Sequence, residues 1–276
     1  MEDFTIAIYC FVDDFLKITT SQQGAKRKMS DAEIITTSVV AARYFGGNLT
    51  TASHYMCCHH GSELPDKSNF NRHMHRLADT MIAIFIAFGQ RLKLLNTESQ
   101  YLIDSFPVAV CKNVRIPTCN LLQEEAYRGY NASKKEFFYG FKVQLITTAQ
   151  GLPVEFYITA GSIHDITAFQ SMNIDLPVGS ELFADSAYTD YELEEYYKEL
   201  EQIHLLVERK SNSKRADTPA MRFIKNYMRK RIETTFSEIT AFFPKKIHAI
   251  TPEGFLLKVF LFIFAYTLNK SLLTAT

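Results

Sequence analysis

The chain has 276 residues, of which 47% are hydrophobic and 22% are charged, as expected for a globular protein with a substantial core. Lysine and arginine balance aspartate and glutamate to a formal net charge of +0, so the total charge does not indicate a nucleic-acid partner. No cationic segment followed by an apolar run opens the chain, so we expect no secretory signal. The five cysteines lack regular spacing, which indicates reduced thiols in a cytoplasm.

The neutral total hides a strong segregation of charge. Residues 181–201 contain eight acidic residues against Lys198 alone. Residues 208–231 contain nine basic residues against Glu208 and Asp217, and these nine are Arg209, Lys210, Lys214, Arg215, Arg222, Lys225, Arg229, Lys230 and Arg231. A cationic segment of this density is suited to the phosphates of a nucleic acid, and the alternative is a solvated helix flank.

The first 95 residues read as helical. Ser30 and Glu33 have the spacing of a capping box, so we expect a helix to begin there. Further start and stop residues predict a helix end at Gly46-Gly47, a short helix from Thr50 or Thr51 to near Gly61, and a longer helix from about Lys67 to Leu95.

From residue 99 the pattern changes to short stretches rich in β-branched and aromatic residues. Three predicted strands come first, SQYLIDSFPVAV, FFYGFKVQLITTA and LPVEFYITA, with a hairpin turn at Gly151-Leu152-Pro153. Helix HDITAFQSM, strand ELFADSAY, helix DYELEEYYKEL, strand IHLLVER and a long helix over about 219–243 follow. The polar segments 111–136 and 209–218 read as irregular connections. This order predicts an α/β domain on a mixed sheet.

The apolar stretch 255–268, FLLKVFLFIFAYTL, has the composition of a membrane span. It is too short for one and contains Lys258, so we expect a buried core helix and no membrane partner.

Two aspartates end apolar runs in the predicted α/β domain. Asp104 follows Tyr101-Leu102-Ile103, and Asp185 follows Leu182-Phe183-Ala184. A carboxylate at the end of a buried strand is costly to desolvate unless a partner neutralises it, although a single such acid is commonly a cap or turn residue. If the two strands are adjacent, the two carboxylates repel unless a divalent cation lies between them. Ligands that are all oxygen indicate Mg²⁺ or Mn²⁺.

Glu233 is the third candidate, on the long helix. Helical periodicity places it about 100° from the centre of the apolar stripe, so we expect it at the edge of the buried face. There it is placed either to act as a third ligand or to form an ordinary i,i+4 ion pair with Arg229.

The ordered motifs LIDSFPV, NASKKEFFYGFKVQLITTAQGLPVEFYITAGSIHD, LFADSAY and RKRIETTFSEI resemble the DDE transposases of bacterial insertion sequences, and among them most closely the nine-eight-two insertion-sequence family. The resemblance covers about residues 30–276 and is strongest from residue 100 onward. It implies a ribonuclease H-like fold in which Asp104, Asp185 and Glu233 bind two Mg²⁺ (or Mn²⁺) ions, with Arg229 assisting catalysis. Related signatures have a tyrosine and a lysine where this chain has Asn226 and Thr240.

Other polar clusters allow further interpretations. In His164-Asp165, the aspartate is either a helix cap or, by the resemblance, a supporting residue near the site. The Cys57–His60 cluster, with His73 and His75 downstream, lacks zinc-ligand spacing, and we do not expect zinc there.

Candidate DNA contacts fall into two groups. The helix over 67–76 carries Lys67, Asn71, Arg72 and Arg76, which are suited to a DNA groove, although a solvated helix face has the same composition. The remaining candidates are cations expected to bind DNA without sequence preference, Lys134, Lys135, Arg222, Lys225 and Lys230.

We therefore expect an all-α, DNA-binding region over residues 1–95 and a ribonuclease H-like catalytic domain with a mixed sheet and C-terminal helices over 96–276. The expected function is divalent-metal-dependent cleavage and strand transfer at insertion-sequence ends. Double-stranded DNA is the expected partner, as terminal inverted repeats and target, and the protein would act as a homodimer on the nucleoid in a bacterial cytoplasm. The alternatives are a metal-dependent nuclease without joining activity and a non-catalytic DNA-binding protein derived from a transposase.

Overall fold

The computed structural model describes residues 1–19, 28–63, 66–131, 135–210 and 213–274. They form two compact units, one made of residues 1–87 and 238–276 and the other of residues 88–237. The helices α5 (Ala78–Leu95) and α8 (Pro219–Thr240) each run from one unit into the other.

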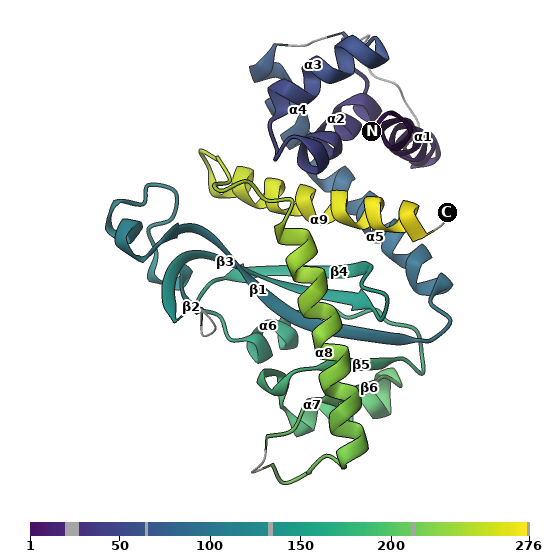
Figure 1. The fold of residues 1–276 in the computed structure, drawn as a ribbon, viewed down its shortest axis with the longest axis vertical. Helices are drawn as coiled ribbons and strands as arrows, with labels where there is room; N and C mark the ends of the chain where they lie inside the picture. The colour runs from purple at the N-terminus through teal and green to yellow at the C-terminus, as the bar shows by residue number, and fades with distance from the viewer. Residues whose placement is uncertain (20–27, 64–65, 132–134, 211–212, 275–276) are drawn as a thin grey trace. The chain divides into compact units, whose positions relative to one another are not determined.

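In the first unit, helices pack around α2. Besides the first part of α5, these helices are α1 (Glu2–Thr19), α2 (Asp31–Tyr44), α3 (Leu49–His60), α4 (Lys67–Arg76) and α9 (Pro252–Thr274). Helix α2 packs against α1, α3, α4 and α9 (Figure 1). Arg43 of α2 donates a 2.8 Å hydrogen bond from Nε to Oδ1 of Asn269 on α9.

The local signals for these helices are confirmed except at one break. The Ser30 backbone N–H donates to Glu33 at 2.8 Å and the Glu33 N–H donates to Ser30 at 3.2 Å, so the capping box is present. Gly61 caps α3 in the left-handed conformation, with φ of 67°. The single helix predicted over 67–95 is wrong, because Leu77 leaves the helical conformation with ψ of 5° and is itself buried, which separates α4 from α5.

Helix α9 is apolar on all sides. Its segment Pro252–Leu272 has a mean hydropathy of 1.5 and is long and apolar enough to cross a membrane by length and composition alone. Of that window, 67% is buried inside the protein, as in the core helix of a soluble protein. Phe260 and Phe264 of α9 meet the ring of Phe85 on α5 edge to face, at centroid distances of 6.0 and 6.1 Å.

The second unit is built on a mixed sheet of six strands. The strands are β1 (Gln100–Lys112), β2 (Arg128–Asn131), β3 (Glu136–Thr148), β4 (Pro153–Ala160), β5 (Glu181–Ala184) and β6 (His204–Val207). Their order is β2-β3-β1-β5-β6, and β4 also pairs with β3. The pairs that involve β3 are antiparallel, and β1–β5 and β5–β6 are parallel, so the mixed sheet is confirmed.

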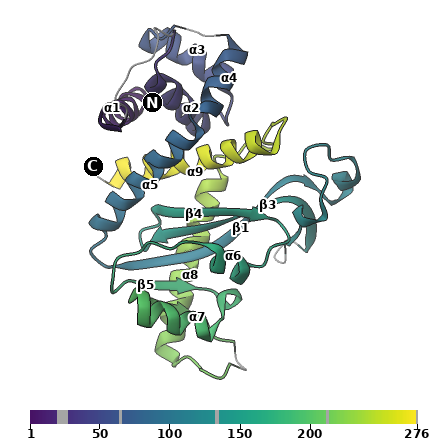
Figure 2. The same ribbon diagram turned by 180° about the vertical axis from the view of Figure 1, so that it is seen from behind.

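Helices cover both faces of this sheet. These are α6 (Asp165–Ser171), α7 (Tyr191–Tyr196) with its continuation Tyr197–Glu201, and α8. Short helical turns occupy Asn113–Thr118, Glu125–Tyr127 and Ser186–Tyr188. Figures 1 and 2 show α8 on one face and α6 and α7 on the other. The segment 111–136, expected to be irregular, contains β2, which pairs with the first residues of β3.

Alternation along β1 and β5 assigns their side chains to the two faces. Leu102 and Phe183 pack with Met228 and Ile232 of α8. Their neighbours, Tyr101, Ile103, Leu182 and Ala184, belong to the core on the opposite face. Because side chains alternate in a strand, residues 104 and 185 belong to the face that α8 covers.

Candidate active site

Asp104 and Asp185 lie next to each other on neighbouring strands. The parallel ladder between β1 and β5 ends with the pair Ile103–Ala184, and each aspartate is the residue that follows. β5 stops there, whereas β1 continues as the antiparallel partner of β3, with Asp104 opposite Leu145. Asp104 therefore lies within a long strand and ends only the parallel part of it.

Both carboxyl groups have raised pKa values. Burial, together with the charge of Asp185, raises the pKa of Asp104 to about 7, although a hydrogen bond from the Ser105 N–H (2.7 Å) opposes the change. Burial also raises the pKa of Asp185, against the Ala187 N–H (2.8 Å) and the charge of Arg229. Among the described residues neither carboxylate forms an ion pair. Two half-buried carboxylates this close together are suited to binding a divalent cation. The cation would offset both the lost solvation of the carboxylates and the repulsion between their charges.

The charge of Arg229 acts on both aspartates and lowers the pKa of each. A small pocket contains Arg229 together with both aspartates, and its lining residues are Leu102, Ile103, Asp104, Phe183, Ala184, Asp185, Lys225, Arg229 and Ile232. Burial lowers the pKa of Arg229, but the charges of Asp185, Glu208 and Glu233 outweigh it and raise the pKa overall. Arg229 contacts Glu208 at 3.3 Å and Glu233 at 3.2 Å. Its guanidinium therefore has two glutamate partners and lies in the same pocket as Asp104 and Asp185.

Glu233 is directed to Arg229 in this structure. Its side chain is 55% exposed, and its Oε1 accepts from Nε of Arg229 across one helical turn. Within the described part of the chain, no group of three or more His, Cys, Asp or Glu is placed to hold a metal ion. The structure thus brings together Asp104, Asp185 and Arg229, while Glu233 forms the i,i+4 pair.

Side chains of β1 and β3 donate hydrogen bonds to Asp165. Its Oδ1 accepts hydrogen bonds from Ser105 Oγ (2.7 Å), Gln144 Nε2 (3.0 Å) and Lys142 Nζ (3.4 Å). The N-cap of α6 is His164, whose side chain makes no capping hydrogen bond. The charge of Asp165 contributes to the raised pKa values of Asp104 and Asp185, so Asp165 lies close to the site.

Gln144 and Tyr188 extend this support, and sequence reasoning did not find them. Both side chains are fully buried, and the Tyr188 hydroxyl donates to Oε1 of Gln144. Burial, together with the charges of Asp104, Asp165 and Asp185, raises the pKa of Tyr188 well above its ordinary value. The available signal was a glutamine flanked by Val143 and Leu145 in a strand, because a polar residue between buried apolar ones requires a buried partner.

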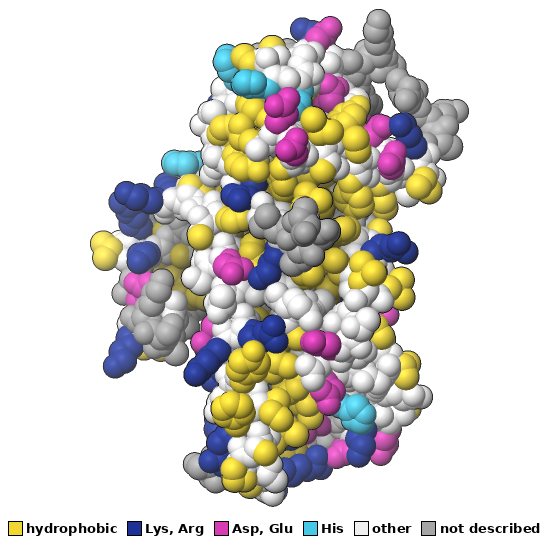
Figure 3. Space-filling model, turned by 45° about the vertical axis from the view of Figure 1, so that its right-hand side comes forward, with side chains coloured by type: hydrophobic (Ala, Val, Ile, Leu, Met, Phe, Trp, Pro, Cys, Tyr) yellow, Lys and Arg dark blue, Asp and Glu magenta, His cyan; other side chains and the backbone are white. Residues whose placement is uncertain are grey.

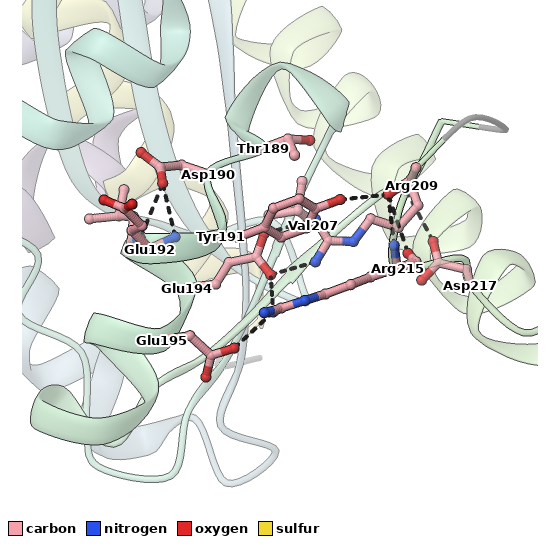
Figure 4. A network of polar contacts seen from close by, with 12 residues as sticks. Thr189, Asp190, Tyr191, Glu192, Glu194, Glu195, Val207, Arg209, Arg215 and Asp217 are labelled. Atoms are coloured by element: carbon pink, nitrogen blue, oxygen red, sulfur yellow. Dashed lines mark hydrogen bonds and ion pairs between the residues drawn. The ribbon is translucent and has the colours of Figure 1, made fainter.

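The basic segment that follows β6 is fixed by internal ion pairs. Figure 4 shows Arg209 and Arg215 directed toward Glu194. The ring of Tyr191 lies beside both guanidinium groups, with centroid distances of 5.0 and 4.7 Å. Asp217 accepts from the Arg209 backbone N–H at 3.0 Å. The contacts with Glu194 and Tyr191 tie Arg209 and Arg215 to α7, and Asp217 is in turn bonded to Arg209.

Lys225 is part of the same internal arrangement. It is buried, with its Nζ 2.5 Å from Oδ1 of Asp217 and 2.8 Å from the Val207 carbonyl oxygen. Of the nine cations in residues 208–231, Arg209 and Lys225 are therefore used inside the protein, whereas Arg222 and Lys230 are exposed. Figure 3 shows basic side chains beside exposed hydrophobic ones over the lower part of this unit.

The other predicted DNA contacts are mostly on the surface. Lys67, Arg72, Arg76 and Lys135 are exposed, and Asn71 is half-buried, with its Nδ2 donating to the Lys67 carbonyl at 3.0 Å. Lys134 lies outside the described residues.

Comparison with known proteins gives one family. The family described as Transposase DDE domain matches residues 96–268, more than half of the chain, including the whole sheet, Asp104, Asp185 and Glu233. The chain belongs to the transposase DDE domain family. No curated protein and no solved structure gave a match. The DDE domain is that of an enzyme acting on DNA, so DNA is the partner of this protein.

Proposed function

We propose that this protein is a DNA transposase that cleaves and joins DNA at the ends of an insertion sequence with two Mg²⁺ or Mn²⁺ ions, and that it belongs to the nine-eight-two insertion-sequence family. The adjacency of Asp104 and Asp185 at the end of the β1–β5 ladder carries the proposal. The strand order, with antiparallel strands on one side of β1 and parallel strands on the other, supports a ribonuclease H-like core.

The chain's own residues divide the work as follows. Asp104, Asp185 and Glu233 would together hold the ions through their carboxylate oxygens. When bound, the ions supply activation of the attacking water or DNA 3′-hydroxyl and charge stabilisation at the leaving oxygen. Arg229 would neutralise negative charge that develops on the phosphoryl group, because its guanidinium already lies in the pocket with both aspartates.

Glu233 must release Arg229 to complete the ligand set. The pair is exposed, and such i,i+4 pairs contribute only about 0.3–0.5 kcal/mol, so the change of partner is inexpensive. Arg229 retains Glu208 as a partner after the change, which keeps its guanidinium beside the site.

The remaining parts of the proposal concern the partner. We infer that the N-terminal helices recognise the terminal inverted repeats through Lys67, Asn71, Arg72 and Arg76. Arg222, Lys230 and Lys135 would add affinity for DNA of any sequence. A homodimer would hold two ends together in the cytoplasm, on the nucleoid.

One experiment separates the candidate functions. The purified protein is incubated with DNA that carries both element ends, with Mg²⁺, with Mn²⁺ or with EDTA, and the products are resolved on a sequencing gel. Metal-dependent cleavage followed by joining supports the transposase. Cleavage without joining supports the nuclease, and binding without cleavage supports the non-catalytic derivative. The matched control is the Asp104→Asn, Asp185→Asn double variant.

A further inference from the structure

A second candidate site lies wholly within the first unit. It is a cleft of about 660 Å³ formed by the turn between α2 and α3 with the first residues of α3, one side of α4 along its length, the segment 244–251 and the first half of α9. Its lining residues are Gly46, Gly47, Asn48, Leu49, Thr50, Lys67, Asn71, Met74, His75, Pro244, Lys246, Ile247, His248, Ala249, Ile250, Thr251, Gly254, Lys258 and Phe262.

The charge of this lining has one sign. Lys67, Lys246 and Lys258 contribute three ammonium groups from three separate segments, and the described lining residues include no aspartate or glutamate. Burial, and then the charge of Lys67, lowers the pKa of Lys258, so these two cations repel each other. An unneutralised cationic cleft of this kind is suited to a polyanion.

The floor and the rim differ in polarity. Met74 and Phe262 are buried below the cleft, and a Cβ on Gly47 would approach the Phe262 ring within 3.2 Å, so glycine allows the turn to lie against the floor. At the rim Lys67 and Lys246 are exposed, and Ile250 is 97% exposed. Lys258 donates to the His248 carbonyl oxygen, which fastens the segment 244–251 to α9. An apolar floor with basic groups above it matches a strand that presents sugar or base on one side and phosphate on the other.

We propose that this cleft binds the phosphate backbone of a DNA strand, with Lys67, Lys246 and Lys258 as its cationic contacts. The proposal rests on the proposed function only in taking DNA as the ligand, and it requires no cleavage chemistry. A DNA strand suits the cleft better than a free phosphate ion, because the cations come from three segments and the floor is apolar. In this proposal the segment 244–251 contacts DNA together with α4, the helix from which DNA binding was expected.

Adjacent lysines allow a matched test. Lys245 and Lys246 are both exposed, but only Lys246 lines the cleft. Full-length Lys246→Ala and Lys245→Ala proteins are titrated with a labelled duplex that carries an element end, in EDTA, over a range of salt concentrations. We expect Lys246→Ala to weaken binding several-fold and to lower the slope of log K against log salt by about 1. Lys245→Ala should stay close to the parent protein. Equal effects of the two variants, or no effect of either, would overturn the proposal.

Lysine acetylation gives an independent readout. DNA should protect Lys67, Lys246 and Lys258 from a water-soluble acetylating reagent more than it protects Lys245. Inorganic phosphate at the same phosphate concentration should not protect them, and equal protection by phosphate would assign the cleft to the free ion and overturn the DNA proposal. The Asp104→Asn, Asp185→Asn protein should show the same protection as the parent, so the cleft stands or falls separately from the cleavage mechanism.

Discussion

Asp104 and Asp185 lie side by side because each follows the last pair of the parallel β1–β5 ladder, Ile103 with Ala184. Burial raises the pKa of both carboxyl groups, and the charge of Asp185 raises that of Asp104 further, so this arrangement is unfavourable for two ionised carboxylates. The sheet therefore holds charge at a cost to its own stability, which is a common property of catalytic sites.

The first prediction concerns this cost. Asp104→Asn should abolish metal-dependent cleavage and, in EDTA above pH 7, should stabilise the protein by about 1 kcal/mol, because it removes a half-buried charge that repels Asp185. The sign follows from the raised pKa. Because this carboxyl group ionises less readily in the folded state than in the unfolded state, the folded protein loses stability as pH rises and the group ionises. Thermal unfolding with and without Mg²⁺ measures the effect. A destabilised Asp104→Asn protein in EDTA would contradict it.

The second prediction compares the roles of Glu233 and Glu208, the two glutamates that pair with Arg229. Glu233→Gln should eliminate cleavage but change the free energy of unfolding by less than about 0.5 kcal/mol, because the Arg229–Glu233 pair is exposed. Glu208→Gln removes a charge from the same arginine and should slow cleavage without eliminating it, because Glu208 positions Arg229 and is not itself a proposed metal ligand. If Glu233→Gln still nicks DNA with Mg²⁺, Glu233 is not a metal ligand.

The third prediction concerns Tyr188. Tyr188→Phe should lower the free energy of unfolding by about 1–3 kcal/mol, because it leaves Oε1 of the buried Gln144 without its donor. Cleavage should also slow, since Gln144 holds Asp165 beside the site. Tyr197→Phe, in the same core, is the control. Equal unfolding midpoints in urea for the two variants would refute this role.

The fourth prediction concerns the ion pair between Arg209 and Glu194. Both side chains are 8% exposed, so Glu194→Gln should destabilise the protein by about 3–5 kcal/mol by leaving a buried guanidinium without its charge partner. Arg215→Ala removes an arginine that is 50% exposed and should cost less than about 1 kcal/mol. Urea denaturation provides the comparison, and similar midpoints for the two variants would count against a structural role for the pair.

The sequence predicted elements well where one local signal decides the structure. Ser30 and Glu33 form the capping box, and Gly151 makes the β3–β4 turn with φ of 81°. Prediction failed where tertiary packing decides. Leu77 leaves the helical conformation, with ψ of 5°, although no glycine or proline marks the break in the sequence. Strand β2 forms because β3 provides a free edge beyond β4.

The site shows the same division. Two aspartates after apolar runs predicted a pair, since parallel strands align their ends at one edge of a sheet. Periodicity placed Glu233 at the edge of the buried face, but it does not determine which partner a long, exposed side chain selects. The sequence placed Lys225 among cations expected to bind DNA, and only the folded structure shows that Asp217 neutralises it inside the protein.

The early end of β5 has a consequence for solubility. Beyond Ile103, β1 runs on to Lys112 without a parallel neighbour among the residues that the structure describes, and such an edge is able to pair with another chain. Pro107 interrupts that edge, because a residue without an N–H cannot continue a hydrogen-bonded ladder. The end of β5 at Ala184 thus places Asp185 beside Asp104 and also exposes an edge of β1 that favours aggregation. Pro107, three residues after Asp104, opposes pairing at that edge.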